Sequence, residues 1–129
     1  MFEAPFPLWS VTLTVAGAVT DVDGLRAALD RLLGAHPFVS SVRYCDTRVE
    51  LRYWDEARDV DDAAAMALRL WPEHQVSAGL PAWGVVGIEV VDRDTVEYRA
   101  AQRARGVNRV QRRDHPGRVL DLLGDIAPW

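Results

Sequence analysis

The sequence contains no lysine, and all 15 of its basic residues are arginine. This absence excludes mechanisms that need a lysine amine, such as a Schiff base or the lysine of a nucleotide-binding P-loop. Cysteine occurs once, at Cys45, so an internal disulfide is also excluded. Glycine-rich phosphate loops and the GxSxG and HExxH motifs are missing as well. The sequence therefore carries no catalytic signature.

Long apolar runs are missing too. No stretch approaches the roughly 18 consecutive apolar residues of a transmembrane helix. The first ten residues, MFEAPFPLWS, contain an acid and two prolines where a signal peptide would carry basic residues. We therefore expect a soluble, cytoplasmic protein without a membrane partner. With 129 residues, 49% of them hydrophobic, the chain has the size and composition of one globular domain.

The charges are unevenly distributed along the chain. Residues 1–98 hold 16 acids and 8 arginines, whereas residues 99–129 hold 3 acids and 7 arginines. The net charge of −4 therefore combines an acidic body with a basic C-terminal end. Such a division between segments is typical of an interaction tail.

Two periodic segments open the chain. Residues 8–19 alternate between apolar and polar side chains, which predicts a half-buried strand. The segment that follows places leucine and alanine at helical spacing behind an N-cap from Thr20 or Asp21. Gly34 and Pro37 then supply stop signals, so this segment predicts an amphipathic helix.

The stretch PFVSSVRYCDTRVELRYWDEA, residues 37–57, predicts a β-hairpin. Val42 and Tyr44 alternate with Arg43 and Cys45 before a short turn at residues 46–47. Apolar and polar side chains alternate again after the turn. Two alternating runs joined by a short turn that contains Asp are typical of an antiparallel hairpin.

A second helix is predicted to begin near Asp59–Asp62. Its expected buried stripe consists of Val60, Ala63, Ala64, Ala67, Leu68 and Trp71. Pro72 either ends this helix or is followed by an irregular turn. Residues 83–92, WGVVGIEVVD, are rich in β-branched side chains and predict a last strand.

This order of elements predicts a ferredoxin-like fold. Right-handed crossovers turn the order strand-helix-strand-strand-helix-strand into an α+β two-layer sandwich. Its antiparallel sheet has the order 4-1-3-2, and both helices cover one face. We assign residues 1–98 to this domain and residues 99–129 to a C-terminal arm.

The run LPAWGVVGIEVVDRDTVEYR, residues 80–99, resembles part of a group of small ferredoxin-like proteins that are widespread in actinobacteria and have no characterised function. The resemblance covers residues 8–99 and implies the same fold. In that group the domain is sometimes followed by a helix-turn-helix segment. The last 25 residues here are too short for one, so the resemblance implies no DNA binding by that route.

The sheet face that the helices leave free is a candidate interaction surface. Alternation places on it Ser10, Thr12, Thr14, Arg43, Cys45, Glu50, Arg52, Trp54, Val85, Gly87, Glu89 and Val91. The first central strand offers only hydroxyls, unlike the aromatic residues with which RNA-recognition domains stack bases.

Three uses of this face stay open. In a symmetric dimer, Arg43 or Arg52 would meet Glu50 or Glu89 across a two-fold axis, with Trp54 as an anchor. In a ligand-binding protein or small enzyme, a pocket would lie between the sheet and the second helix or a second subunit. We expect its lining to include Cys45, Arg43, Arg52, Trp54 and His36. The face could also be only solvated.

The single cysteine, the three histidines and the two acidic runs can each be explained without a catalytic or metal-binding role. An Arg43 guanidinium could lower the pKa of Cys45, but nucleophilic catalysis also needs a histidine, and His36 precedes the other end of the same strand. The three histidines, His36, His74 and His115, have no second ligand at the spacing of a metal site. We therefore expect no metal and no cofactor. The acidic runs at residues 21–24 and 59–62 are interpreted as helix caps.

The arm has a basic half and an apolar half. Residues 98–113 contain six arginines and no acid, in a helical extension that Gly106 is expected to interrupt. This run could bind phosphates, fold back on the acidic body or remain solvated. Residues 117–129 predict a short amphipathic docking helix. The candidate docking residues are Arg99, Arg103, Arg105, Arg109, Arg112, Arg113, Leu120, Leu123 and Trp129.

The sequence favours a non-enzymatic protein-interaction or regulatory module. We expect a homodimer that docks through its arm, with residues 106–129 as the contact for a protein partner. Small-molecule binding or catalysis in a dimeric α+β barrel is the first alternative. Nucleic-acid binding through the arginines is the second.

Overall fold

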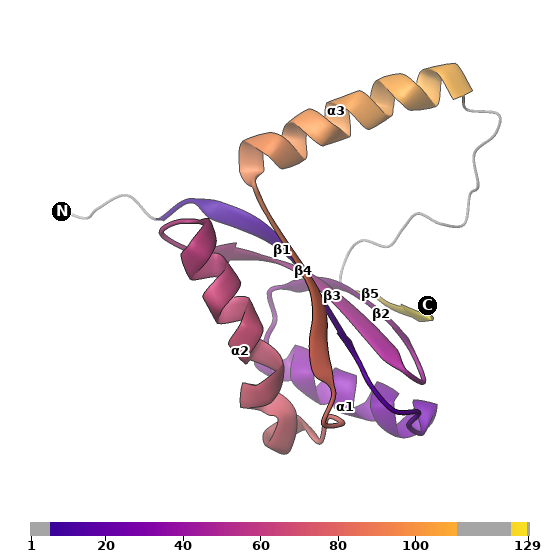
Figure 1. Ribbon diagram of the computed structural model, residues 1–129. Coiled ribbons are helices and arrows are strands. Elements are labelled where there is room, and N and C mark those ends of the chain that lie inside the picture. Colours follow the sequence, from indigo (N-terminus) through magenta and orange to yellow (C-terminus); the bar gives the residue numbers. More distant parts are fainter. Residues whose placement is uncertain (1–5, 111–124, 129) are drawn as a thin grey trace.

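The computed structural model describes residues 6–110 and 125–128, with side chains described for residues 6–106. In chain order its elements are β1 (Leu8–Ala16), α1 (Val22–Ala35), β2 (Val39–Cys45), β3 (Arg48–Glu56), α2 (Val60–Ala78), β4 (Gly84–Asp92), α3 (Arg93–Val110) and β5 (Asp125–Pro128). The strands form one sheet in the order β4-β1-β3-β2-β5. Helices α1 and α2 lie together on one side of the sheet, and α3 projects away from them (Figure 1).

The predicted ferredoxin-like α+β sandwich is confirmed. Four antiparallel strands have the predicted order 4-1-3-2, and two helices pack on one face. The predicted interruption at Gly106 is wrong, because α3 continues to Val110. A glycine in an exposed helix costs only about 1 kcal/mol relative to alanine, which is too little to end this one. No helix in the described part of the chain is long and apolar enough to cross a membrane.

A fifth strand, β5, pairs in parallel with β2, from Ser41 opposite Asp125 to Tyr44 opposite Pro128. The helix predicted for residues 117–129 is therefore wrong at its end, while residues 111–124 and 129 lie outside the described residues. The edge of β2 offers unpaired backbone groups, which favour an added strand.

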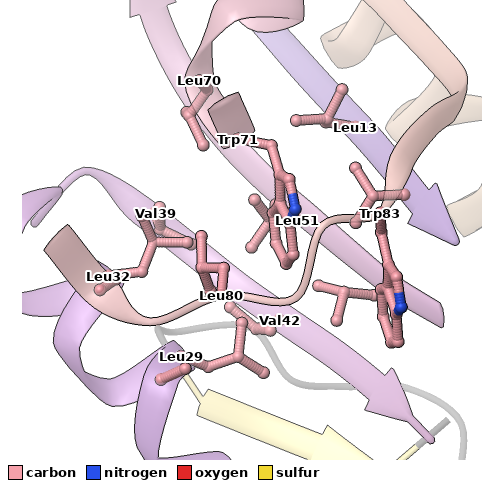
Figure 2. Packing of buried hydrophobic residues seen from close by; sticks show 14 of the residues in the cluster. Leu13, Leu29, Leu32, Val39, Val42, Leu51, Leu70, Trp71, Leu80 and Trp83 are labelled. Carbon is pink, nitrogen blue, oxygen red and sulfur yellow. The ribbon is translucent and has the colours of Figure 1, made fainter. Parts of the chain in front are cut away.

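Two stacked tryptophans lie in the core between the sheet and the helices (Figure 2). The rings of Trp71 and Trp83 are 6.3 Å apart and within 4° of parallel. Trp71 Nε1 donates to the carbonyl of Pro81 and Trp83 Nε1 to that of Ala18, both at 3.0 Å. Because a buried indole N–H without a partner is costly, these bonds fix the segment that leads into β4.

Helix α2 buries a narrow stripe made of Ala63, Ala67, Leu70, Trp71 and Ala78. The predicted stripe is wrong at Val60 and Leu68, which are 44% and 48% exposed, because the buried side is turned toward Leu70. Pro72 cannot donate to the carbonyl of Leu68, four residues earlier. Both residues lie on the solvent side, where water can bind that carbonyl, and the helix continues to Ala78.

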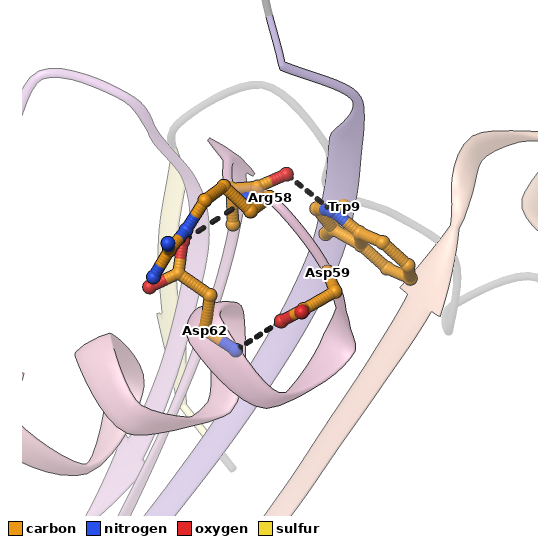
Figure 3. A network of polar contacts seen from close by, with 5 residues as sticks. Trp9, Arg58, Asp59 and Asp62 are labelled. Atoms are coloured by element: carbon orange, nitrogen blue, oxygen red, sulfur yellow. Dashed lines mark hydrogen bonds and ion pairs between the residues drawn. The ribbon is translucent and has the colours of Figure 1, made fainter.

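Aspartates cap the starts of α1 and α2, as the acidic runs predict. Asp59 Oδ1 accepts the N–H of Asp62 at 2.8 Å, and Asp62 Oδ2 accepts the N–H of Arg58 at 3.0 Å (Figure 3). Asp21 Oδ2 accepts the N–H of Gly24 at 2.8 Å in the same way. The two runs therefore satisfy free N–H groups at the helix starts.

The predicted hairpin is confirmed, with β2 and β3 antiparallel on either side of residues 46–47. The predicted position of Val85 on the free face is wrong. Between β1 and β4, Thr14 lies opposite Gly87 but Val15 lies opposite Val85, so Val86 is an extra residue. This bulge reverses the alternation, and Val85 packs against the core.

Candidate functional site

The free sheet face is polar, as predicted. Rows of paired residues cross it, namely Gly87–Thr14–Glu50–Arg43, Glu89–Thr12–Arg52 and Val91–Ser10–Trp54. Cys45 continues the alternation of β2 on the same side. Trp54 is 37% exposed, so the proposed anchor is only partly accessible.

The acids of this face have partners in their own chain. Arg43 Nη1 is 4.0 Å from Glu50 Oε1, and Arg99 Nη1, from α3, is 3.3 Å from Glu89 Oε2. The sequence predicts that these acids meet Arg43 or Arg52 of a second copy. Exposed pairs of this kind contribute only about 0–1 kcal/mol each. Charge complementarity therefore gives the face little tendency to pair with itself.

Cys45 lies at the end of β2, with its Sγ 3.6 Å from Thr47 Oγ1. Hydrogen bonds with the backbone and the hydroxyl of Thr47 lower the pKa of the thiol. The predicted cause, the Arg43 guanidinium, is not among those that lower it. His36 precedes the opposite end of β2, so this thiol is not placed beside that base.

Helix α3 carries three of the predicted docking residues, Arg99, Arg103 and Arg105, in exposed positions. Its first turns contact β1 and β4, and the rest extends away from the body (Figure 1). The predicted residues Arg109, Arg112, Arg113, Leu120, Leu123 and Trp129 have no described side chains, and all but Arg109 also lie outside the described backbone. Arg99, Arg103 and Arg105 therefore lie on an exposed helix, and Arg99 forms an ion pair with Glu89.

Strand β4 is an edge strand, and β1 is its one neighbour among the described strands. Its nine residues include neither lysine nor proline, and Val86 and Ile88 are 59% and 39% exposed. Natural sheet edges are usually protected by charges, prolines, bulges or covering segments. Here a bulge occurs at Val86, but Gly84–Ile88 carries no charge. The bulge is therefore the one of these local features that Gly84–Ile88 has, since the stretch carries neither a charge nor a proline.

A hollow of about 210 Å³ lies beside α2, where β2 begins and β3 ends. Four of its lining residues have ring side chains, namely His36, Phe38, Tyr53 and Trp54. Met66 and Leu70 contribute apolar surface from α2. The charged residues at the hollow are Asp55, Arg69 and Glu73. Small-molecule sites commonly combine apolar walls with a few polar groups in this way.

One of the lining residues, His36, contacts a second histidine, His74. The rings of His36 and His74 are 4.9 Å apart in a T-shaped arrangement, and His74 Nδ1 lies 3.0 Å from the carbonyl oxygen of Leu70. Since a carbonyl only accepts, this contact assigns the proton to Nδ1 of His74. Nδ1 of His36 is buried without a hydrogen-bond partner. Burial, and secondarily His74, lower the pKa of His36, which favours a neutral ring.

The hollow includes only part of the predicted pocket. His36 and Trp54 are among its lining residues, whereas Arg43, Cys45 and Arg52, which share the free face with Trp54, are not. The sequence reasoning missed Asp55 and the contact between His36 and His74, because 37 residues separate the two histidines in the chain. Among the described side chains, no three His, Cys, Asp or Glu residues are grouped to hold a metal ion.

Comparisons with known proteins place the chain in an uncharacterised family. A profile described as "Domain of unknown function (DUF8830)" matches residues 8–107. No curated protein matches. Among solved structures, the chain is similar to an acylphosphatase from Coxiella burnetii, with 18% identity and a TM-score of 0.38. That match covers 67% of this chain and 81% of the other. At this level the similarity says nothing about activity.

Proposed function

Because the chain belongs to the DUF8830 family, for which no function is described, we propose its role from the structure. The protein is a non-enzymatic interaction module that forms homodimers by pairing the β4 edges of two copies. The observation that carries this proposal is the uncharged and accessible stretch Gly84–Ile88 at the sheet edge.

A second copy is the partner that this edge fits best. Two identical strands related by a two-fold axis run antiparallel, so each satisfies the free backbone groups of the other. Pairing centred in Gly84–Ile88 brings no like charges together at its centre, and it covers the exposed side chains of Val86 and Ile88. Beyond this stretch, Glu89 is already ion-paired with Arg99.

The arm supports the same assignment. At the opposite side of the sheet, β5 pairs with β2 of its own chain and covers that edge. Among the strands that the structure describes, β4 is then the edge that has no second neighbour. The predicted docking function of the arm is thus interpreted as docking on its own domain.

The test places a lysine on the edge. We expect the full chain to have twice its 14.4 kDa mass by light scattering at micromolar concentration. Val86→Lys should give the monomer, because a charged edge resists pairing. Val76→Lys is the matched control, since Val76 is 90% exposed on α2 and should leave the dimer intact. A monomeric native chain, or a dimer that survives Val86→Lys, would reject the proposal.

A second candidate function, nucleic-acid binding through α3, is supported by exposed Arg103 and Arg105. Arg93 and Arg99 contribute less, because each has an ion pair within the chain. Binding to a single-stranded DNA probe should weaken steeply between about 50 and 200 mM salt if phosphates are the ligand. An absence of binding at low salt would remove this candidate.

A further inference from the structure

The hollow beside α2 presents one carboxylate among several rings. We propose that it binds a small organic cation, a protonated aromatic amine, with Asp55 as the counter-charge and the surrounding rings as the walls. This site is separate from the β4 edge, so it stands or fails independently of dimer formation.

The walls are suited to a cationic aromatic ligand. Phe38 is 71% exposed and Trp54 is 37% exposed, so both offer accessible ring surface. Aromatic faces attract cations through their quadrupole, and they stack on other rings. Met66 and Leu70 add apolar contact for the body of the ligand. A cation with an aromatic body would therefore use the rings as well as the carboxylate.

The charges at the hollow favour a cation over an anion. Arg69 Nε lies 3.6 Å from Glu73 Oε2, so the positive charge there already has a partner. Asp55 accepts the backbone N–H of Glu56, and burial raises the pKa of its carboxyl group. Burial produces such a shift, and the interaction with His36 lowers the pKa of Asp55 by less than burial raises it. Because the lowered pKa of His36 favours a neutral ring, the carboxylate of Asp55 is the group in the hollow with which a ligand cation would pair.

The volume limits the size of the ligand. A hollow of about 210 Å³ is smaller than most drug-binding pockets but larger than an engineered cavity of about 150 Å³ that holds benzene. One aromatic ring with a short amine substituent fits this range. Nucleotides and other large cofactors do not.

Three probes of similar shape and different charge provide the first test. Benzylamine, benzyl alcohol and benzoate are titrated separately into the full-length protein at neutral pH, with amide chemical shifts as the readout. We expect benzylamine to shift the amides of residues around the hollow and to bind about tenfold more tightly than the other two. Equal or tighter binding of benzoate would overturn the proposal, as would the absence of shifts around the hollow.

Variants then test which residues are responsible. Asp55→Asn should weaken benzylamine binding about tenfold, while Asp61→Asn, an exposed acid in the first turn of α2, should not change it. Phe38→Ala should weaken it severalfold, with Tyr98→Ala on α3 as the exposed aromatic control. Asp55→Asn removes a half-buried charge, so we expect it to fold. Unchanged affinity in Asp55→Asn would show that the carboxylate is not the counter-charge.

Discussion

At the scale of single residues, the indole of Trp83 leaves no room for a side chain at Gly17. A Cβ atom at Gly17 would overlap Trp83 Cδ1, whereas one at Gly34 in α1 would meet nothing within 4 Å. Trp83 is held by its stacking on Trp71 and by its bond to Ala18, so it cannot move away freely. The two glycines therefore tolerate a methyl group very differently.

We expect Gly17→Ala to lower the free energy of unfolding by about 1–3 kcal/mol, as overpacking does. Gly34→Ala should raise it by up to about 1 kcal/mol, since alanine is the better helix former. Urea unfolding of the two variants measures both changes. Equal effects of the two substitutions would contradict the close contact at Trp83.

His36 gives the stability a dependence on pH. Its pKa is lowered from the ordinary 6.5, chiefly by burial, so below 6.5 the unfolded chain binds a proton that the folded chain resists. The free energy of unfolding should therefore fall as the pH drops below about 6.5. The pKa of Asp55 is raised from its ordinary value of 3.8, so its effect is the opposite. Between pH 3.8 and the raised pKa, its protonation in the folded chain increases the free energy of unfolding as the pH falls.

His36→Phe keeps a ring against Tyr53 and His74 but removes the titration. Urea unfolding at several pH values between about 5.5 and 7.5 should show a smaller fall for this variant than for the native chain. Parallel curves for the two proteins would show that His36 is not the group responsible.

At the scale of the elements, the start of α2 depends on one cap. The bond from the Asp62 N–H to Asp59 Oδ1 is 2.8 Å long, and next to it Trp9 Nε1 donates to the carbonyl of Ala57 at 3.0 Å, which joins this turn to β1 (Figure 3). Asp59→Ala should cost about 1 kcal/mol of stability. Asp61→Ala, in the same first turn, should cost a few tenths, since it loses only the interaction with the helix dipole. Chemical unfolding separates the two, and equal losses would contradict the capping role.

Elements with local signals could be predicted from the sequence. Alternation located β1 and the hairpin, and the aspartate caps located α1 and α2. Gly84 and Gly87 indicate a bulge or a close backbone approach in the last strand, but the position of the extra residue at Val86 depends on how β1 and β4 pair. The strand character of β5 was also missed, since it depends on the edge of β2, far away in the sequence.

The candidate site was less predictable than the fold. The residues of the free face follow from alternation, but the ion pair of Glu89 with Arg99 requires the position of α3. The hollow depends on distant segments, since His36 precedes β2, Asp55 lies near the end of β3 and Arg69 lies on α2. Such a constellation arises only from tertiary packing, so sequence spacing gave no signal for it.

At the scale of the whole molecule, the sheet has two edges with different protection. β5 covers the β2 side along Ser41–Tyr44, while β4 pairs with β1 and with no second strand among those the structure describes. One accessible edge leads to a closed dimer, because two identical edges that pair leave no further edge. Two accessible edges would instead allow association to continue without closure.

Removal of residues 111–129 should therefore convert a dimer into larger, open-ended assemblies. The truncated chain retains α3 but loses β5, so the backbone groups of Ser41–Tyr44 become available for pairing. Light scattering over a concentration series should show a mass that keeps rising for the truncated chain and levels at two copies for the full one. Val86→Lys in the truncated chain should limit growth, because only the β2 edge then remains. A truncated chain that stays at the mass of the full-length assembly would show that β5 does not protect the β2 edge.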